Sequence, residues 1–405
     1  MIDYQNFFTQ NLQTLKTEGR YRIFADLERR VGQAPYAIWH APNGEKKTVV
    51  VWCSNDYLGM SHHPEVIKAF QDAAAYHGVG AGGTRNISGT SRLHVELEST
   101  LAELHQKQSA LVFSSGYAAN EAALSALGEG LPNVVFFSDE KNHASMIQGM
   151  RHSQAEKYVF RHNNMQDLRQ KLAAVDRGRP KIIAVVSVYS MDGDFAPLAQ
   201  ICDLAQEFNA LTYVDEVHAV GIYGPKGNGM AAEQGVLDRV DIIQGNFAKA
   251  YGVVGGYITG TQSVIDYVRS YASGFIFTTS LPPATAAAAH KSIEILKGNS
   301  IYRQQLWQNV RYLKQQLRQS RVRFVDSASH IVPVVVGDAF ACQYLSQTLL
   351  HDFHMYAQPI NYPTVPRGQE RLRLTVTPAH TFSLIDHLVE TLDSLWSGMP
   401  LRQAA

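Results

Sequence analysis

The sequence predicts an α/β protein with a large, mostly parallel sheet and a smaller second α/β domain. Between residues 49 and 283, short apolar runs alternate with helical patterns, as in strands joined by helices on both faces of a sheet. The chain has 405 residues, and 45% of them are hydrophobic. At about 150 residues per domain this length predicts two or three domains. We expect an N-terminal arm over residues 1–50, a large domain over 51–290 and a C-terminal domain over 291–405.

The N-terminal arm is expected to be helical, because apolar residues recur at helix-like intervals, namely Phe7, Leu12 and Leu15 and then Ile23, Phe24 and Leu27. The strands expected in the large domain are 110–113, 134–137, 157–160, 182–187, 211–214, 242–244 and 256–259. Beyond them we expect helices over 284–297, 302–317 and 383–396 and strands over 331–336 and 372–375. These later elements form the smaller α/β domain.

Charge and cysteine content exclude several classes of protein. The 36 basic residues balance the 36 acidic ones, so no strong field favours nucleic acid or an anionic membrane. No apolar run approaches the ~20 residues that span a bilayer, and no signal peptide is recognisable. Cys53, Cys202 and Cys342 are scattered, with neither metal-binding spacing nor a disulfide framework. We expect a cytoplasmic protein without a metal site.

An acid and a lysine follow neighbouring apolar runs. Asp215 ends the run 211–214, and Lys249 follows the run 240–243 among small residues that let a bulky ligand approach the backbone. In a parallel sheet both lie at the carboxyl edge, where such sheets bind ligands. An acid there can hold a pyridinium nitrogen protonated, and a lysine can form a Schiff base with an aldehyde. Together they predict a site for pyridoxal 5′-phosphate (PLP).

Two histidines could complete this site. His218 lies three residues after Asp215 and could bond the phenolic oxygen of the cofactor, although an Asp-x-x-His pair alone is weak evidence. His143 follows the strand expected over 134–137 and could stack on the cofactor ring. A capped helix with a solvated histidine is the alternative reading of His143.

A phosphate cup is expected where Ser115, Gly116 and Tyr117 open a helix after a strand, because backbone N–H groups at a helix start bind anions. The glycine-rich segment 78–86 resembles a dinucleotide loop, but a helix rather than a strand precedes it, so a glycine-rich active-site loop fits better. Arg373 either points outward from an alternating strand or grips an amino-acid carboxylate, and the residues alone leave this open.

Eight segments together carry a family resemblance. They are residues 18–22, 52–60, 83–90, 142–147, 187–194, 215–221, 274–283 and 361–368. With them, the chain resembles the α-oxoamine synthase family of fold-type I PLP enzymes from about residue 17 to 387. It is most similar to the members that form 5-aminolevulinate. The resemblance implies the PLP-dependent aminotransferase-like fold and the decarboxylating condensation of glycine with succinyl-CoA for tetrapyrrole (haem) synthesis.

The resemblance also implies residue roles. Lys249 would bind the cofactor and act as general base, while Asp215, His218 and His143 would tune the ring. The remaining cofactor contacts would come from Ser115, Gly116, Tyr117, Ser190, Asn246, Thr278 and Thr279. The substrate contacts would come from Arg22, Asn55, Thr84, Asn86, Ser138, Lys157, Thr364 and Arg373.

Two of these groups carry further implications. Thr279 would reach the phosphate in the neighbouring subunit, which implies a homodimer with shared active sites. Arg22, Thr84, Asn86 and Thr364 would hold the succinyl carboxylate, which siblings using other acyl groups do not need.

The chain departs from the family pattern at Asn246, where relatives usually carry threonine. Asparagine can still donate a hydrogen bond to phosphate, so altered anchoring is expected rather than its loss. Two alternatives stay open: a sibling acyltransferase with another acyl-CoA, and a PLP-binding protein without turnover. A nucleotide-binding dehydrogenase is the weakest alternative, because its fingerprint is absent.

Overall fold

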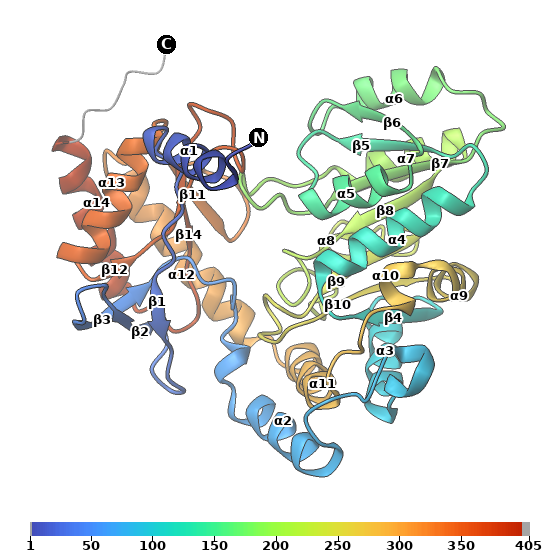
Figure 1. Cartoon of the computed structure of the whole chain (residues 1–405), viewed down its shortest axis with the longest axis horizontal. Coiled ribbons are helices and arrows are strands. Elements are labelled where there is room, and N and C mark those ends of the chain that lie inside the picture. The colour runs from blue at the N-terminus through green and yellow to red at the C-terminus, as the bar shows by residue number, and fades with distance from the viewer. Residues whose placement is uncertain (1, 399–405) are drawn as a thin grey trace. The chain divides into compact units, whose positions relative to one another are not determined.

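The computed structural model describes residues 2–398 and divides the chain into two compact units (Figure 1). The larger unit comprises residues 58–189 and 194–303, and the smaller one comprises 1–57, 190–193 and 304–405. Residue 1 and residues 399–405, which belong to the expected terminal domains, lie outside the described residues. The boundaries therefore differ from the expected 50/51 and 290/291, and the N-terminal arm is part of the smaller unit.

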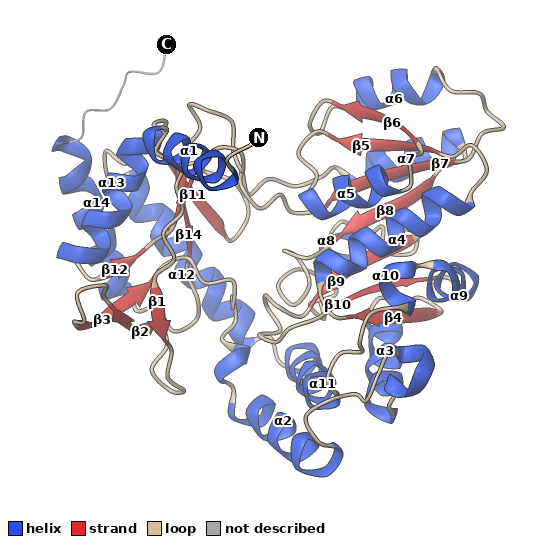
Figure 2. Ribbon diagram, viewed as in Figure 1, coloured by secondary structure: helices blue, strands red, loops and turns tan. Residues whose placement is uncertain are grey.

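A seven-stranded sheet forms the centre of the larger unit (Figure 2). Its strand order is β4-β10-β9-β8-β7-β5-β6. The strands are β4 (Ser109–Phe113), β5 (Val135–Asp139), β6 (Glu156–Phe160), β7 (Lys181–Val186), β8 (Leu211–Asp215), β9 (Ile242–Asn246) and β10 (Gly256–Gly260). Only β10 runs antiparallel to its neighbours β4 and β9. Each of the seven strands expected from the sequence is confirmed to within two residues.

Inner parallel strands such as β7 and β9 are buried on both faces, and β7 accordingly reads as a continuous apolar run. The parallel edge strand β6 is largely exposed. The helices of this unit with at least eight residues are α2 (Pro64–His77), α3 (Arg92–Leu104), α4 (Gly116–Gly130), α5 (Ala144–His152), α6 (Met165–Ala173), α7 (Leu198–Phe208), α9 (Gln262–Tyr271) and α11 (Pro283–Gly298). The shorter ones are α8 (Met230–Glu233) and α10 (Ser273–Ile276), with single turns over Met60–His62 and Arg85–Gly89. Helices α4 and α5 pack on each other, α6 packs on α7, and α11 packs on α2 and α3.

The smaller unit contains two sheets. One has the order β1-β2-β3-β12, with β12 parallel to β3, and the other is the antiparallel sheet β11-β14-β13. The strands are β1 (Asp26–Glu28), β2 (Tyr36–His40), β3 (Lys46–Val51), β11 (Ile331–Val335), β12 (Met355–Tyr356), β13 (Pro359–Ile360) and β14 (Arg371–Thr375). Its helices are α1 (Tyr4–Thr17), α13 (Ala339–Asp352), α14 (Phe382–Gly398) and α12 (Ile301–Arg318), which begins in the larger unit.

The expectation of a helical arm over residues 1–50 is wrong beyond Thr17. Three strands follow α1, and β2 alternates buried and less buried side chains, the period-two pattern of a strand on one face of a core. Ala37, Trp39 and Val49 form a buried cluster there. The helix-like spacing of Ile23 with its neighbours was misleading, because this side chain is exposed. Between residues 2 and 398, no helix has both the length and the apolar character needed to cross a membrane.

Candidate active site

Asp215 ends β8 at the carboxyl edge of the sheet, and its side chain is buried and oriented on both oxygens. The backbone N–H of Val217 donates to Oδ1 at 2.9 Å, and Asn120 Nδ2 of α4 donates to Oδ2 at 2.8 Å. Tyr213 in turn donates its hydroxyl to Asn120 Oδ1 at 2.9 Å, which fixes the orientation of the amide. The carboxyl group is therefore held in one position, from which it can bond a cationic partner.

Asn120 also connects Asp215 to His143. Its Nδ2 lies 3.0 Å from Ser145 Oγ, and Ser145 Oγ lies 2.7 Å from His143 Nδ1. His143 is the N-cap residue of α5, where its Nδ1 accepts from the backbone N–H of Ser145. Desolvation lowers the pKa of His143, with Asp215 opposing this shift and Lys249 adding to it. The ring is exposed and neutral at ordinary pH, so it can stack on a flat ligand.

Lys249 lies just beyond the end of β9, and its Nζ is 2.8 Å from Nε2 of His218. His218 is buried, whereas Lys249 is partly exposed. The structure thus brings together Asp215, His218, His143 and Lys249 at one edge of the sheet, as the sequence predicted for neighbouring strand ends.

The start of α4 forms a tight backbone cradle beside β9 and β10. Ser115 is the N-cap residue, and its Oγ accepts from the backbone N–H of Ala118 at 3.0 Å. A Cβ placed on Gly116 would lie 2.9 Å from Cβ of Asn246 and 3.2 Å from its Nδ2. Asn246 is buried, and its Oδ1 has no hydrogen-bond partner among the described residues.

This arrangement fits PLP. The glycine-lined helix start suits the phosphate, with Asn246 Nδ2 beside it as a candidate donor, while Asp215 suits the ring nitrogen and Lys249 suits the aldehyde. The side chain of Tyr117 is half exposed and its ring centroid lies 6.5 Å from that of His143, next to the same cradle.

A second group of expected site residues lies in the loops 84–90 and 277–280. Thr84 pairs with Thr279 in an isolated antiparallel bridge, and the backbone N–H of Ser280 donates to Gly83 O at 3.0 Å. Asn86 is exposed on the turn that follows Thr84. Among the described residues of this chain, neither Thr278 nor Thr279 makes a hydrogen bond to the cradle at α4.

Arg85 anchors this loop. Its guanidinium pairs with both carboxylate oxygens of Glu98 at 2.7 and 3.0 Å, and Glu98 Oε1 also accepts from the backbone N–H of Val112 on β4. The ion pair is mostly buried, with 9% of the Arg85 side chain exposed. It holds the loop to the edge strand of the sheet.

Two expected substrate residues lie on β5 and β6. Ser138 is buried, and its hydroxyl accepts from Asn142 Nδ2 at 2.9 Å. Lys157 lies on the edge strand β6, three residues before its carboxyl end, and is exposed.

In the smaller unit, Arg373 lies on β14 and its guanidinium bonds Asn55 Oδ1, which also accepts from the Tyr57 hydroxyl at 3.2 Å. Arg373 is buried, so the outward-pointing alternative for this strand is wrong. Arg371, on the same face, is buried as well and donates to Asp192 Oδ1 and Met191 O, both at 2.8 Å. Ser190 is partly exposed and begins the segment 190–193 that Arg371 holds.

Arg22 and Thr364 also meet in the smaller unit, where Arg22 Nη2 donates to Thr364 Oγ1 at 3.3 Å. Both line a cavity of about 800 Å³ between the segment 19–26, the end of β2 and α13. The four residues expected to hold an acyl carboxylate are thus distributed over both units, with Thr84 and Asn86 in the larger one.

Comparison with known proteins identifies the family. The aminotransferase class I and II family matches residues 47–392. The 5-aminolevulinate synthase of Rhizobium meliloti is 53% identical over 403 residues, covering 100% of both chains. 5-Aminolevulinate synthase 1 of Cereibacter sphaeroides is 52% identical over 403 residues, covering 100% of this chain and 99% of the relative. The chain belongs to the 5-aminolevulinate synthase family. It is therefore a PLP-dependent acyltransferase, and the predicted fold class and cofactor are confirmed.

Solved structures agree with this family. Serine palmitoyltransferase of Sphingomonas wittichii superimposes with a TM-score of 0.89 at 30% identity, covering 98% of this chain and 97% of that one. The 8-amino-7-oxononanoate synthase of Francisella tularensis has a TM-score of 0.73 at 24% identity over 86% of this chain and 98% of its own, which shows a shared fold.

Sequence reasoning missed Asn120 as a functional residue, although the segment containing it was read as a helix start. The signal was its place on α4 four residues after Gly116, one helical turn beyond the cradle. Its partners Tyr213 and Ser145 could not be inferred, because each lies on a different element.

Proposed function

We propose that this protein condenses glycine with succinyl-CoA, releasing coenzyme A and carbon dioxide and giving 5-aminolevulinate for tetrapyrrole (haem) biosynthesis. The observation that carries the proposal is the meeting of Asp215, Lys249 and His218 beside the cradle of α4. The family membership supports the acyltransferase reaction, since the relatives are 5-aminolevulinate synthases.

When bound, PLP supplies an electron sink that stabilises a carbanion next to nitrogen. Asp215, oriented by Asn120 and Val217, would hold the proton on the ring nitrogen through a charge-assisted bond. Lys249 would bind the aldehyde carbon until the amine of glycine displaces it, and the released Nζ would then remove the glycine proton as general base. His218, 2.8 Å from Nζ, would orient the amine and bond the phenolic oxygen.

His143 would cover one face of the ring as a neutral imidazole, which the direction of its pKa shift supports. Ser115, Gly116, Tyr117 and Asn246 would hold the phosphate from the start of α4, where the helix dipole favours an anion. Ser190 would contact the ring oxygen. Each of these roles is a proposal that rests on the family and on the positions described above.

For the substrates, Arg373 and Asn55 would bind the glycine carboxylate, and the short contact between them supports a preformed fork. Arg22, Thr364, Thr84 and Asn86 would bind the succinyl carboxylate, since a buried carboxylate needs charged and hydroxyl donors. Ser138 and Lys157 would contact the acyl-CoA.

The acyl assignment is tested with Arg22→Leu. We expect the KM for succinyl-CoA to rise about ten- to hundred-fold, because the variant loses one hydrogen bond to a charged group. The KM for glycine should change much less. Arg29→Leu is the matched control, since Arg29 is an exposed arginine seven residues further on, and both constants should stay unchanged. Equal changes for both substrates in Arg22→Leu would argue against its acyl role.

Acyl preference is tested by comparing turnover with succinyl-, acetyl- and octanoyl-CoA. Succinyl-CoA should give the highest kcat/KM. A preference for either of the other thioesters would move the protein to a sibling activity.

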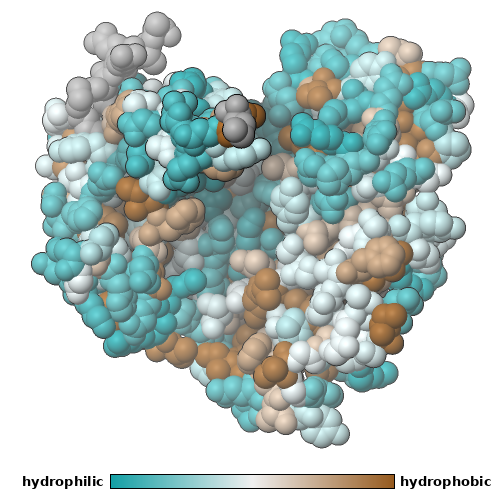
Figure 3. Space-filling model, in the orientation of Figure 1, coloured by the Kyte–Doolittle hydropathy of each residue, from teal (hydrophilic) through white to brown (hydrophobic). Residues whose placement is uncertain are grey.

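We further propose a homodimer in which Thr278 and Thr279 complete the site of the partner. Exposed apolar side chains support this: Tyr76, Val79, Ile87 and Phe277 are 76–87% exposed, and α1 has no buried residue. Brown apolar patches are visible on the face shown in Figure 3. A cytoplasmic location stays a prediction from the sequence.

The dimer is tested by light scattering together with cofactor retention on dilution. Dissociation into monomers should release PLP, because the threonines of the partner are then lost. Cofactor that stays bound to a monomer would contradict shared sites.

A further inference from the structure

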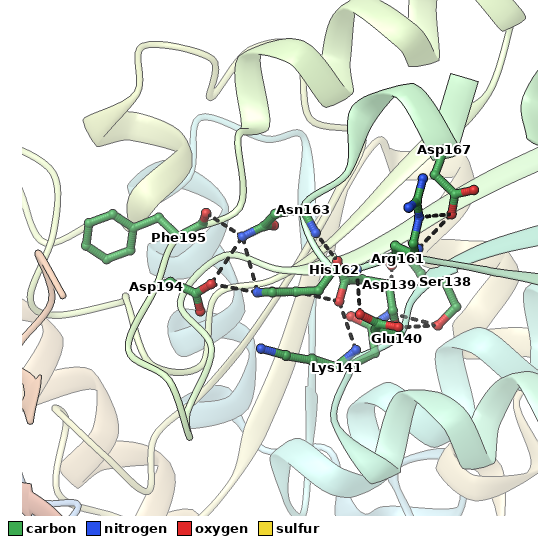
Figure 4. Close-up of polar contacts among 12 residues, drawn as sticks. Ser138, Asp139, Glu140, Lys141, Arg161, His162, Asn163, Asp167, Asp194 and Phe195 are labelled. Atoms are coloured by element: carbon green, nitrogen blue, oxygen red, sulfur yellow. Dashed lines mark hydrogen bonds and ion pairs between the residues drawn. The ribbon is translucent and has the colours of Figure 1, made fainter. Parts of the chain in front are cut away.

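His162 occupies a position that none of the roles above uses. It lies two residues beyond the end of β6, and each of its ring nitrogens faces a carboxylate (Figure 4). Nδ1 lies 2.8 Å from Asp139 Oδ1, and Nε2 lies 2.6 Å from Asp194 Oδ2. Ionised carboxylates only accept hydrogen bonds, so both nitrogens must carry a proton. The geometry therefore describes an imidazolium held between two anions.

The surroundings support that charge state. The His162 side chain is 12% exposed and Asp139 is fully buried. Burial lowers the pKa of His162, but the hydrogen bonds and charges of Asp139 and Asp194 outweigh it and raise this pKa to about 9. The other titratable groups that face the residue are Tyr189, whose ring meets the imidazole edge-on at 4.4 Å, and Glu140, whose Oε1 accepts from the His162 backbone.

On one side the imidazolium holds the turn that presents His143. Besides His162, Asp139 accepts from the backbone N–H groups of Lys141 at 2.8 Å and Asn163 at 2.9 Å. Asn142 continues the turn, with its Nδ2 bonded to Ala184 O on β7 at 2.7 Å. His143 follows directly and starts α5, so the direction of its ring depends on where this turn is fixed.

On the other side the imidazolium holds the base of a hairpin that follows β7. Asp194 O accepts from the backbone N–H of Tyr189 at 3.0 Å, and Val188 pairs with Phe195 in an isolated bridge. Asn163 adds a bond from its Nδ2 to Phe195 O at 3.0 Å. Ser190, the proposed contact to the cofactor oxygen, is the next residue after this base.

We propose that His162 is a positioning residue of the active site, which as a doubly bonded imidazolium fixes both the turn before His143 and the hairpin base before Ser190. This inference rests on the cofactor roles proposed above for His143 and Ser190. A neutral ring keeps only one donor, so deprotonation releases one of the two carboxylates and loosens the segment that it holds.

The test uses His162→Gln in the PLP-loaded protein, with the circular dichroism of the bound cofactor as the readout. In the wild type the signal should be constant at neutral pH and fall through a transition near pH 9. In His162→Gln we expect a weaker signal without that transition, and a kcat about ten-fold lower with a smaller change in KM. Asp194→Asn keeps the ring but removes one anion, so it should move the transition to lower pH.

Two controls separate this inference from the proposed function. His152→Gln removes another imidazole–carboxylate contact, 2.6 Å to Glu121, at the exposed end of α5, and should leave the signal and its pH dependence unchanged. His143→Ala should alter the signal strongly. If it does while His162→Gln and Asp194→Asn both keep the wild-type transition, the positioning role is overturned and the proposed function stands. If His143→Ala has no effect, the cofactor role of His143 fails and the inference fails with it.

Discussion

At the residue scale, the proposed chemistry of the larger unit depends on a few side chains whose positions are fixed by hydrogen bonds from neighbouring residues. Asp215 is held in one orientation by Asn120 together with the backbone N–H of Val217, and Asn120 is itself held by the hydroxyl of Tyr213. One amide nitrogen serves both Asp215 and Ser145, so the carboxylate and the His143 side chain are set by the same residue. Such supporting contacts are what keep catalytic groups within reach of productive geometry.

Lys249→Ala removes both the proposed covalent anchor of the cofactor and the proposed base. We expect no measurable 5-aminolevulinate formation and weaker cofactor retention, because His218 and Asp215 alone cannot bind the aldehyde carbon. The measurement is a steady-state assay with PLP in excess. Lys226→Ala, at an exposed lysine of the same unit, is the control and should be fully active. Substantial turnover by Lys249→Ala would refute the assignment.

Asn246 is the residue at which the sequence predicts a departure from the family pattern, and its buried Oδ1 has no hydrogen-bond partner among residues 2–398. Asn246→Thr exchanges the amide for a hydroxyl at the end of β9, where a β-branched residue also suits the strand. We expect similar or higher activity and slower loss of PLP on dialysis. Asn246→Val introduces a side chain of the same shape as threonine but without the hydroxyl, so this variant should lose PLP faster. Faster loss from Asn246→Thr would show that the amide is the better anchor here.

At the scale of elements, the cradle depends on the close approach of β10 to the start of α4. A Cβ placed on Gly256 would lie 2.5 Å from both N and Cα of Gly116. These are backbone atoms, so they cannot rotate away as the end of a side chain could. Strand β10 can approach the start of α4 here because position 256 is glycine, whereas the glycine at position 116 makes room for Asn246 of β9.

Gly256→Ala should therefore push the start of α4 away from β10. We expect a loss of about 1–3 kcal/mol in the free energy of unfolding, typical of overpacking, and a weaker affinity for PLP. Gly260→Ala on the same strand is the matched control, because its nearest atom would be Asp241 O at 3.1 Å. Denaturant unfolding and PLP titration measure the two effects. Equal losses in both variants would contradict the role of Gly256 in forming the cradle.

The elements also show what the sequence could predict. Buried strands such as β7 carry continuous apolar runs with clear ends, so the large sheet and the edge that holds Asp215 and Lys249 were predictable. The strands β1–β3 were missed because the apolar spacing of residues 7–27 was extended too far as a helix. The roles of His162 and Asn120 stayed hidden, since their partners are 23 to 95 residues away in sequence.

For the whole molecule, buried histidines in both units limit stability on the acid side, and His105 and His380 are two of them. Burial lowers the pKa of His105, hydrogen-bonded to the Tyr257 hydroxyl in the larger unit, to about 3, and that of His380 in the smaller unit to about 4. Both must stay neutral in the folded state. Stability is therefore lost as pH falls below the unfolded value of about 6.5.

The contribution of His162 to stability has the opposite pH dependence, because Asp139 and Asp194 raise the pKa of His162. Its stabilisation is complete below pH 6.5 and is lost as pH rises through about 9. After allowance for solvent at Asp194, which is 37% exposed, it amounts to about 1–3 kcal/mol. The free energy of unfolding, measured by denaturation between pH 4 and 10, should thus pass through a maximum near pH 6–7. His162→Gln should flatten the alkaline side only, and an unchanged alkaline slope would contradict the charge assigned to His162.

The central claim is that Lys249 carries the cofactor opposite the carboxylate of Asp215. Borohydride reduction of the PLP-loaded protein, followed by peptide mass spectrometry, tests it most directly. The account predicts a phosphopyridoxyl group on the peptide that contains Lys249 and on no other lysine. A modification at a different lysine, or none in protein that has retained PLP, would contradict it.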